Sequence, residues 1–458
     1  MPLITRIVLV RHGESTFNTN NMVQGRGNLD RPELQSVLTE KGQQQAGLAG
    51  AALANLHFDA AYVSPLLRAR QTAEQILAAS SSPPPVTFHE GLCEINLPAW
   101  EGLTFDEVRS QFPDQFHNWE HEPHKLVVSD RYPVLDLFEQ AKAFWQEVLP
   151  KHTGQTILIV GHSGVNRALI STVIGLQPAQ YHHLQQINCA ISVLNFAGDN
   201  LSNLGSDLSN VQVQLESLNL TSHLTSLTKS VLPPPRKVHI GPRILLVRHG
   251  ETDWNRQKRF QGQIDVPLNA KGEEQAQQAA DFLASVTLHK AFSSPMLRPK
   301  DTALKILTHH PEVELEYFDE LKEISHGLWE GKFEAEIEAE FAGELEKWQK
   351  NPEIVQMPEG ENLQQVWDRV AEAWLQIIRA TPAGETALVV AHDAVNKAIL
   401  CQLFGFEPEK FWIFKQGNGG VSVIDYYKGY EHPPMLQAMN ITTHLSNSVF
   451  DQTAAGAL

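Results

Sequence analysis

The sequence predicts two tandem α/β domains, in each of which a mostly parallel sheet is covered by helices on both faces. Three observations carry this prediction. The segment LVRHGESTFN, which begins at Leu9, recurs as LVRHGETDWN from Leu246. In each copy, short apolar runs alternate with amphipathic helical patterns. With 458 residues, the chain is too long for one hydrophobic core and suits two domains of ordinary size.

The expected elements follow the same order in both copies. Each copy starts with a short apolar run that ends at an Arg-His-Gly motif, which predicts a buried strand followed by a loop. An amphipathic helix, a second strand, a third strand and another helix follow. In the first copy these elements are predicted at residues 7–10, 43–56, 60–65, 156–162 and 165–175, and in the second at 244–247, 273–285, 290–295, 386–392 and 395–405.

The repeat also places the domain boundary. LNLTSHL at residues 218–224 resembles MNITTHL at residues 439–445, so residues 198–228 are interpreted as a long hairpin and tail of the first domain. This interpretation predicts domains over residues 1–228 and 242–458. The linker between them, residues 229–241, contains three consecutive prolines at 233–235 and should be a semi-rigid spacer.

Charge, cysteine content and hydropathy limit the partners and the location expected for this protein. The net charge of −17 argues against nucleic-acid partners and against an anionic membrane surface, because both reward basic patches. Three cysteines provide neither a disulfide framework nor metal-ligand spacing. The sequence has no signal-peptide pattern and no apolar run of membrane-spanning length, so a cytoplasmic protein is expected.

Arginine and histidine residues lie directly after the predicted strands. Arg11-His12 and Arg248-His249 follow the first strand of each copy, and a second histidine follows the third strand. Ligands bind beyond the carboxyl ends of parallel strands, so these side chains should share one site in each copy. A histidine flanked by arginine suits attack on phosphorus, because guanidinium groups bind phosphoryl oxygens through paired N–H donors.

Five positions in each copy resemble the histidine phosphatase superfamily, also called phosphoglycerate mutase-like. Besides the segments above, the matching runs are SPLLRARQTA and CEINLPAWEG in the first copy, and SPMLRPKDTA and KEISHGLWEG in the second. The resemblance covers nearly the whole chain and implies two three-layer α/β/α domains. The catalytic residues that it implies are Arg11, His12, Arg68, Glu94 and His162 in the first copy, and Arg248, His249, Arg298, Glu323 and His392 in the second.

The resemblance also implies a mechanism. The histidine of the Arg-His-Gly motif matches the nucleophile, a neutral imidazole that forms a phosphohistidine intermediate. The arginines and the second histidine would hold the phosphoryl oxygens. The glutamate matches the proton donor, whose pKa a dianionic substrate should raise. No metal or other cofactor is expected. Further positions that match substrate-contacting residues are Asn18, Gln24, Gly25, Asn255, Gln261 and Gly262.

The two copies differ around these positions. The second reads HGLWEG and PEGENL, as the family often does, where the first reads LPAWEG and VVSDRY. After the nucleophile, the second copy carries Arg256, Lys258 and Arg259, whereas FNTNNMVQG in the first is uncharged. These differences suggest that the second site accepts the more anionic substrate and that the first is a divergent copy.

Phosphatase and mutase share this chemistry. Neither copy shows the long insertion by which mutases of the family close their site, so hydrolysis of a small phosphomonoester is favoured. The resemblance extends to tandem members acting on 2-carboxyarabinitol 1-phosphate and to metal-independent phosphoserine phosphatases. Sugar phosphates and α-ribazole phosphate also stay open. The alternatives are mutase-type phosphoryl transfer, one catalytic domain beside a non-catalytic binding domain, and a scaffold. The sequence does not determine the oligomeric state.

Overall fold

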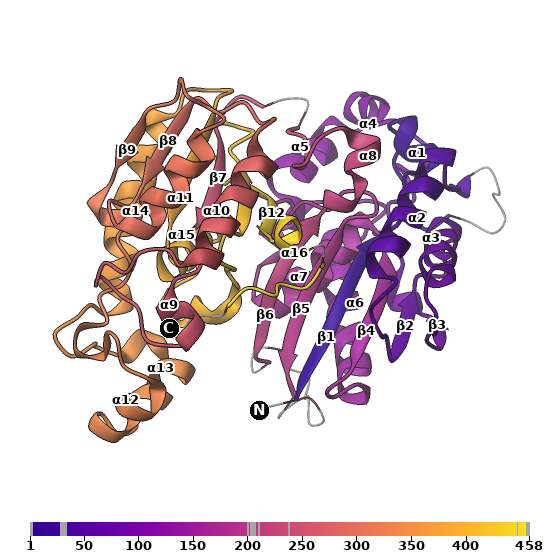
Figure 1. Cartoon of the computed structure of the whole chain (residues 1–458). Helices are drawn as coiled ribbons and strands as arrows, with labels where there is room; N and C mark the ends of the chain where they lie inside the picture. The colour runs from indigo at the N-terminus through magenta and orange to yellow at the C-terminus, as the bar shows by residue number, and fades with distance from the viewer. Residues whose placement is uncertain are drawn as a thin grey trace. The chain divides into compact units, whose positions relative to one another are not determined.

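The computed structural model describes residues 3–27, 34–198, 201, 208, 211–236, 239–446 and 448–454 (Figure 1). The chain divides into two compact units, Met1–Lys229 and Ser230–Leu458. The predicted linker at 229–241 stays a prediction, and its residues 237–238 lie outside the described residues, as do residues 28–33. In the described part of the chain, no helix combines the length and the hydropathy needed to cross a membrane.

The first unit contains a mixed sheet with a parallel majority. Its strands lie in the order β3-β2-β4-β1-β5-β6. The pairs β3·β2, β2·β4 and β4·β1 are parallel, whereas β5 and β6 are antiparallel to their neighbours. The strand bounds are β1 Ile4–Arg11, β2 Ala60–Val63, β3 Val86–Phe88, β4 Thr156–Gly161, β5 Ile191–Ala197 and β6 Val213–Leu220.

The second unit repeats this arrangement. Its strands lie in the order β12-β11-β7-β10-β8-β9, and again three pairs are parallel and two are antiparallel. The prediction of a mostly parallel sheet is therefore confirmed in part. Three of the five strand pairs in each unit are parallel, but each sheet is mixed. The strand bounds are β7 Arg243–Arg248, β8 Lys290–Ser293, β9 Leu315–Tyr317, β10 Thr386–Ala391, β11 Val421–Asp425 and β12 Met435–Ile441.

Helices cover both faces of each sheet. Four consecutive residues of β1, Ile7 to Val10, are fully buried, and neighbouring residues of a strand point to opposite faces. The helices of the first unit are α1 Thr16–Thr19, α2 Glu40–Leu53, α3 Leu67–Ala78, α4 Phe105–Gln111, α5 Pro113–His121, α6 Pro133–Val148, α7 Ser163–Ile174 and α8 Thr225–Thr228. Those of the second are α9 Asp253–Gln257, α10 Ala270–Leu283, α11 Leu297–Leu307, α12 Glu334–Glu340, α13 Glu344–Lys350, α14 Leu363–Ala380, α15 Asp393–Leu403 and α16 Thr443–Ser446.

Local capping explains where the predicted helices begin. Helices α2 and α10 start three residues earlier than the apolar pattern suggests, because Thr39 and Asn269 act as N-caps and accept hydrogen bonds from the amides of Gly42 and Gly272. At the other end, α7 stops at Gly175, whose φ of 93° favours glycine. These caps fix the helices that flank the carboxyl ends of the central strands.

Candidate active site

The first and third predicted strands lie side by side and bring the two histidines together. In the first unit, Arg11 at the end of β1 pairs in register with Gly161 at the end of β4, so His12 and His162 leave the sheet at the same edge. Their ring centroids lie 5.1 Å apart. In the second unit, the rings of His249 and His392 lie 5.2 Å apart in the same way. All four histidines are at least 98% buried.

The first histidine of each pair is held in one tautomer. Nδ1 of His12 lies 2.7 Å from the carbonyl oxygen of Gly13, and Nδ1 of His249 lies 2.7 Å from that of Gly250. A carbonyl oxygen only accepts, so Nδ1 carries the proton and Nε2 presents its lone pair. In the second unit, Nε of Arg298 donates to Nε2 of His249 at 3.2 Å.

Burial keeps these imidazoles neutral. The pKa of His12 and that of His249 lie well below 6.5, first because of burial and then because of the adjacent arginines. The residue after each of these histidines must be glycine, because another backbone segment packs closely against it. A Cβ on Gly250 would collide with the carbonyl oxygen of Gly272, and a Cβ on Gly13 would collide with that of Gly42. A neutral, oriented imidazole whose Nε2 carries the lone pair is the form that can attack an electrophile.

Two buried arginines flank each candidate nucleophile. Arg11 donates to the carbonyl oxygen of Gln186 at 2.7 Å, and Arg68 on α3 donates to that of Gly25 at 3.0 Å. Burial lowers the pKa of each to about 10, so both stay charged at neutral pH. Within the described part of the chain, their Nε atoms are buried without a hydrogen-bond partner. These donors could meet the oxygens of an anion beside His12.

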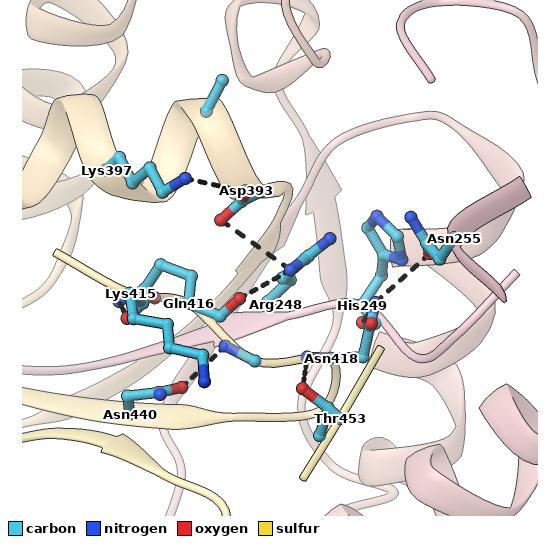
Figure 2. A network of polar contacts seen from close by, with 12 residues as sticks. Arg248, His249, Asn255, Asp393, Lys397, Lys415, Gln416, Asn418, Asn440 and Thr453 are labelled. Carbon is cyan, nitrogen blue, oxygen red and sulfur yellow. Dashed lines mark hydrogen bonds and ion pairs between the residues drawn. The ribbon is translucent and has the colours of Figure 1, made fainter. Parts of the chain in front are cut away.

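The second unit repeats the arginine pair. Arg248 donates to the carbonyl oxygen of Gln416 at 2.5 Å, and Arg298 on α11 donates to that of Gly262 at 2.7 Å. Figure 2 shows Arg248 beside His249, with Asp393 on the other side of the arginine. The distance from Nη1 of Arg248 to Oδ1 of Asp393 is 3.8 Å. The second unit therefore adds a carboxylate behind its phosphate-binding candidate.

The second histidine of each pair shares a hydrogen bond with the hydroxyl group of a buried serine. Nε2 of His162 lies 2.7 Å from the hydroxyl of Ser64, and Nε2 of His392 lies 3.0 Å from that of Ser294. The Nδ1 atom of each ring is buried and has no hydrogen-bond partner among the described residues. A proton on Nδ1 would give each site one more donor.

The glutamates lie at helix N-termini. The carboxylate of Glu94 accepts hydrogen bonds from the amides of Gly164 and Val165, in the first turn of α7, at 3.0 and 3.1 Å. Glu323 accepts from Ala394 at the start of α15 at 3.4 Å. Burial, and then the charge of Asp393, raises the pKa of Glu323, which favours its protonated form. Both copies therefore place a buried carboxyl group near the arginine–histidine set.

These ten residues are the set that the family resemblance implied. The model of the histidine phosphatase superfamily (branch 1) matches residues 7–205 and 244–441. The chain belongs to this superfamily. Its membership makes it a phosphomonoesterase with two tandem histidine phosphatase domains.

Curated relatives match this histidine phosphatase over one or both domains. It is 29% identical over 457 residues to the 2-carboxy-D-arabinitol-1-phosphatase of Triticum aestivum, covering 96% of this chain and 86% of the wheat protein. A probable enzyme of the same name from Arabidopsis thaliana is 28% identical over 451 residues, covering 96% of this chain and 88% of that protein. Phosphoserine phosphatase 1 of Hydrogenobacter thermophilus is 34% identical over 203 residues, covering 44% of this chain and 94% of that protein.

The residues predicted to contact the substrate lie around the candidate nucleophile, but their oxygen atoms accept hydrogen bonds from neighbouring residues of the protein. Oδ1 of Asn18 accepts from the amide of Ser15 at 3.1 Å, and Oε1 of Gln24 accepts from the Ser15 hydroxyl at 2.8 Å. Asn255 and Gln261 bond to Thr252 in the same way. Gly25 and Gly262 contribute the carbonyl oxygens that hold the α3 and α11 arginines. In this histidine phosphatase, these residues shape the loop that carries the candidate nucleophile.

Sequence reasoning missed several residues of the site. Asn188 and Asn418 each donate from Nδ2 to the carbonyl oxygen of the nucleophilic histidine candidate, at 3.0 and 3.3 Å. The repeat could have marked them, because each lies 26 residues after the second histidine of its copy (188 − 162 and 418 − 392). The two serines could have been found, because each one begins the matched SPLLR or SPMLR segment. Asp393 could have been found as the residue that replaces Ser163.

Two of the three basic residues after His249, Arg256 and Arg259, have partners of their own. Nε of Arg256 pairs with Glu251 at 2.8 Å. Arg259 donates to Gln257 and to the carbonyl oxygen of Gly331. The sequence suggested that this run makes the second pocket the more basic one. The structure does not support that reasoning, because a carboxylate neutralises Arg256, and Arg259 is held at Gly331 and over the ring of Phe333.

Proposed function

We propose that both domains hydrolyse small phosphomonoesters without a metal, through a phosphohistidine intermediate. The observation that carries this proposal is the orientation of His12 and His249, whose Nδ1–H is held by a carbonyl so that Nε2 presents its lone pair, with two buried arginines near each ring. Arginine and histidine donors carry positive charge or N–H groups, which suit a phosphoryl dianion and repel a divalent cation.

The first step follows from this geometry. The two arginines and the second histidine bind the phosphoryl oxygens, and Nε2 of the nucleophile attacks phosphorus in line with the ester oxygen. The new P–N bond forms as the P–O bond to the alcohol breaks. The protonated glutamate, Glu94 or Glu323, gives its proton to the departing alkoxide.

The second step reverses these roles. The glutamate, now a carboxylate, takes a proton from a water molecule, which attacks the phosphohistidine. The P–N bond breaks, inorganic phosphate leaves, and the histidine and the glutamic acid return to their starting states. The raised pKa of Glu323 supports its role as the acid of the first step.

The substrate is proposed from the relatives. A protein similar along almost the whole chain carries the name 2-carboxy-D-arabinitol-1-phosphatase, and a shorter one is a phosphoserine phosphatase. We infer a small phosphomonoester of the sugar-phosphate, 2-carboxyarabinitol 1-phosphate or phosphoserine type, with no nucleic-acid or membrane partner.

The test is phosphate release by His12→Ala, His249→Ala and the double variant, over a panel of phosphomonoesters with EDTA present. Each single variant should keep part of the activity and the double variant none. Full activity in His249→Ala would contradict a catalytic second domain, and loss of activity in EDTA would contradict the metal-free mechanism. A requirement for a bisphosphate primer would instead indicate mutase-type transfer.

A further inference from the structure

The two sites differ in the cations that flank the glutamate. In the first domain, Arg26 lies directly after Gly25, and its Nε donates to the backbone carbonyl oxygen of Glu94 at 3.0 Å. In the second domain, Gln263 holds the matching position, and its Nε2 donates to the carbonyl oxygen of Glu323 at 3.0 Å. The two side chains make the same hydrogen bond, so the exchange changes charge and preserves the local contact.

A second exchange moves a cation onto the neighbouring helix. Gln140 on α6 corresponds to Arg369 on α14, which donates to the carbonyl oxygen of Glu323 at 3.2 Å. A carboxylate neutralises Arg369: Glu361 accepts from its Nε and Nη2 at 2.7 and 2.9 Å. In the first domain, Arg26 instead donates to the neutral amide oxygen of Gln140 at 2.5 Å. The cation beside the glutamate is paired with a carboxylate in the second domain and with an amide in the first.

The helix that follows the second histidine shows the same contrast. Arg167 on α7 donates to the carbonyl oxygen of Leu184 at 2.7 Å and to Oε1 of Gln185 at 3.3 Å, both neutral acceptors. Its counterpart on α15 is Lys397, which is paired at 3.0 Å with Asp393 (Figure 2). Arg167 and Lys397 are 8% and 5% exposed, so solvent screens neither cation strongly.

The shared parts of the sites do not remove this difference. Each domain has two buried arginines, one glutamate next to the arginine–histidine set, and one carboxylate, Glu101 or Glu330, that accepts from the loop after its Gln-Gly pair. In the first domain, Arg26 and Arg167 add two cations with neutral partners. In the second, the two added cations are each matched by an anion. Among the residues that the structure describes, the first site therefore has the more positive surroundings.

We propose that the first site selects phosphomonoesters that carry a second anionic group, such as a carboxylate near the phosphoester, and that the second site selects esters without one. This assignment rests on the proposed hydrolysis of phosphomonoesters. It reverses the sequence-based hypothesis, which gave the more anionic substrate to the second site. A cation beside the bound ester stabilises a second anionic group of the same ester. A cation that is already paired with a carboxylate does not.

The test compares two esters with one carbon skeleton. 3-Phosphoglycerate carries a carboxylate where glycerol 3-phosphate carries a hydroxymethyl group. The ratio of their kcat/KM values is measured for His249→Ala, which keeps the first site, and for His12→Ala, which keeps the second. We expect this ratio, acid over alcohol, to be about tenfold higher at the first site, as expected for one charge-assisted contact. Equal ratios, or a higher ratio at the second site, would overturn the assignment.

Charge exchanges test the cause. Arg26→Gln in the His249→Ala background should lower the ratio mainly through KM for the acid, and Gln263→Arg in the His12→Ala background should raise it. Each substitution installs the residue that makes the same carbonyl contact in the other domain, so the fold should persist, and thermal unfolding checks that it does. A ratio that moves in neither variant would refute the role of Arg26. If neither the His249→Ala nor the His12→Ala variant released phosphate, the proposed function itself would be refuted. Phosphate release with equal ratios would refute only the assignment of substrates to the two sites.

Discussion

Ser294 should control which nitrogen of His392 carries the proton. His392 is fully buried, and its pKa lies well below 6.5 because of burial and then the charge of Arg298. A neutral ring has one N–H. If the Ser294 hydroxyl, 3.0 Å away, donates to Nε2, the ring proton lies on Nδ1, which has no protein partner among the described residues and can donate to a phosphoryl oxygen. Ser294→Ala removes this control.

The size of the expected effect follows from the hydrogen bond that Nδ1 of His392 would donate to a phosphoryl oxygen. A hydrogen bond to a charged acceptor contributes about 1.5–3 kcal/mol, so its loss in the transition state should lower kcat/KM by roughly ten- to a hundredfold. The unpartnered Nε2 should also lower the free energy of unfolding by about 1–3 kcal/mol. Ser294→Cys keeps a weak S–H donor and should lose less activity.

The assay is steady-state phosphate release in the His12→Ala background, which reports the second site alone. Ser64→Ala in the His249→Ala background should show a similar loss, because Ser64 and His162 lie 2.7 Å apart. Thermal unfolding separates a catalytic effect from a folding defect. A folded Ser294→Ala variant with unchanged kcat/KM would refute the argument about the tautomer, as would an equal loss in Ser294→Cys.

Three other perturbations test the second domain. Asp425→Ala removes the buried bidentate partner of Arg243, at 2.7 and 2.8 Å, and should cost about 3–5 kcal/mol in urea unfolding; a cost under about 1 kcal/mol would contradict this. The folded pKa of His249 lies below its unfolded value of 6.5, so the unfolded state binds more protons and the free energy of unfolding should fall as pH drops below 6.5. The His249→Gln variant should lack this part of the pH dependence, and identical profiles would be the contrary result. Gly250→Ala should abolish phosphate release at this site and destabilise the domain, because its Cβ would collide with the Gly272 carbonyl; wild-type activity and thermal stability would argue against this contact.

Much of the fold follows from local sequence. Apolar runs bounded by the Arg-His-Gly motif predicted the first strands, and helical periodicity predicted α2, α7, α10 and α15 to within a few residues. The starts of α2 and α10 were missed because N-cap side chains and polar first turns lie outside the apolar pattern. The antiparallel strands β5 and β6 have no catalytic motif to mark their place in the sheet.

The sequence by itself determined that the chain holds two histidine phosphatase domains, because the candidate nucleophile and its arginines recur in order. Tertiary structure alone decided which charges act near each site. Arg256 and Arg259 are close to His249 in sequence but bind other groups, whereas Arg26 donates to the backbone carbonyl oxygen of Glu94, 68 residues further along the chain. Electrostatic energy depends on distance and on paired counter-charges, and only the folded chain sets these. The duplicated motif therefore identifies the family, and the partners of a few cations distinguish the two sites.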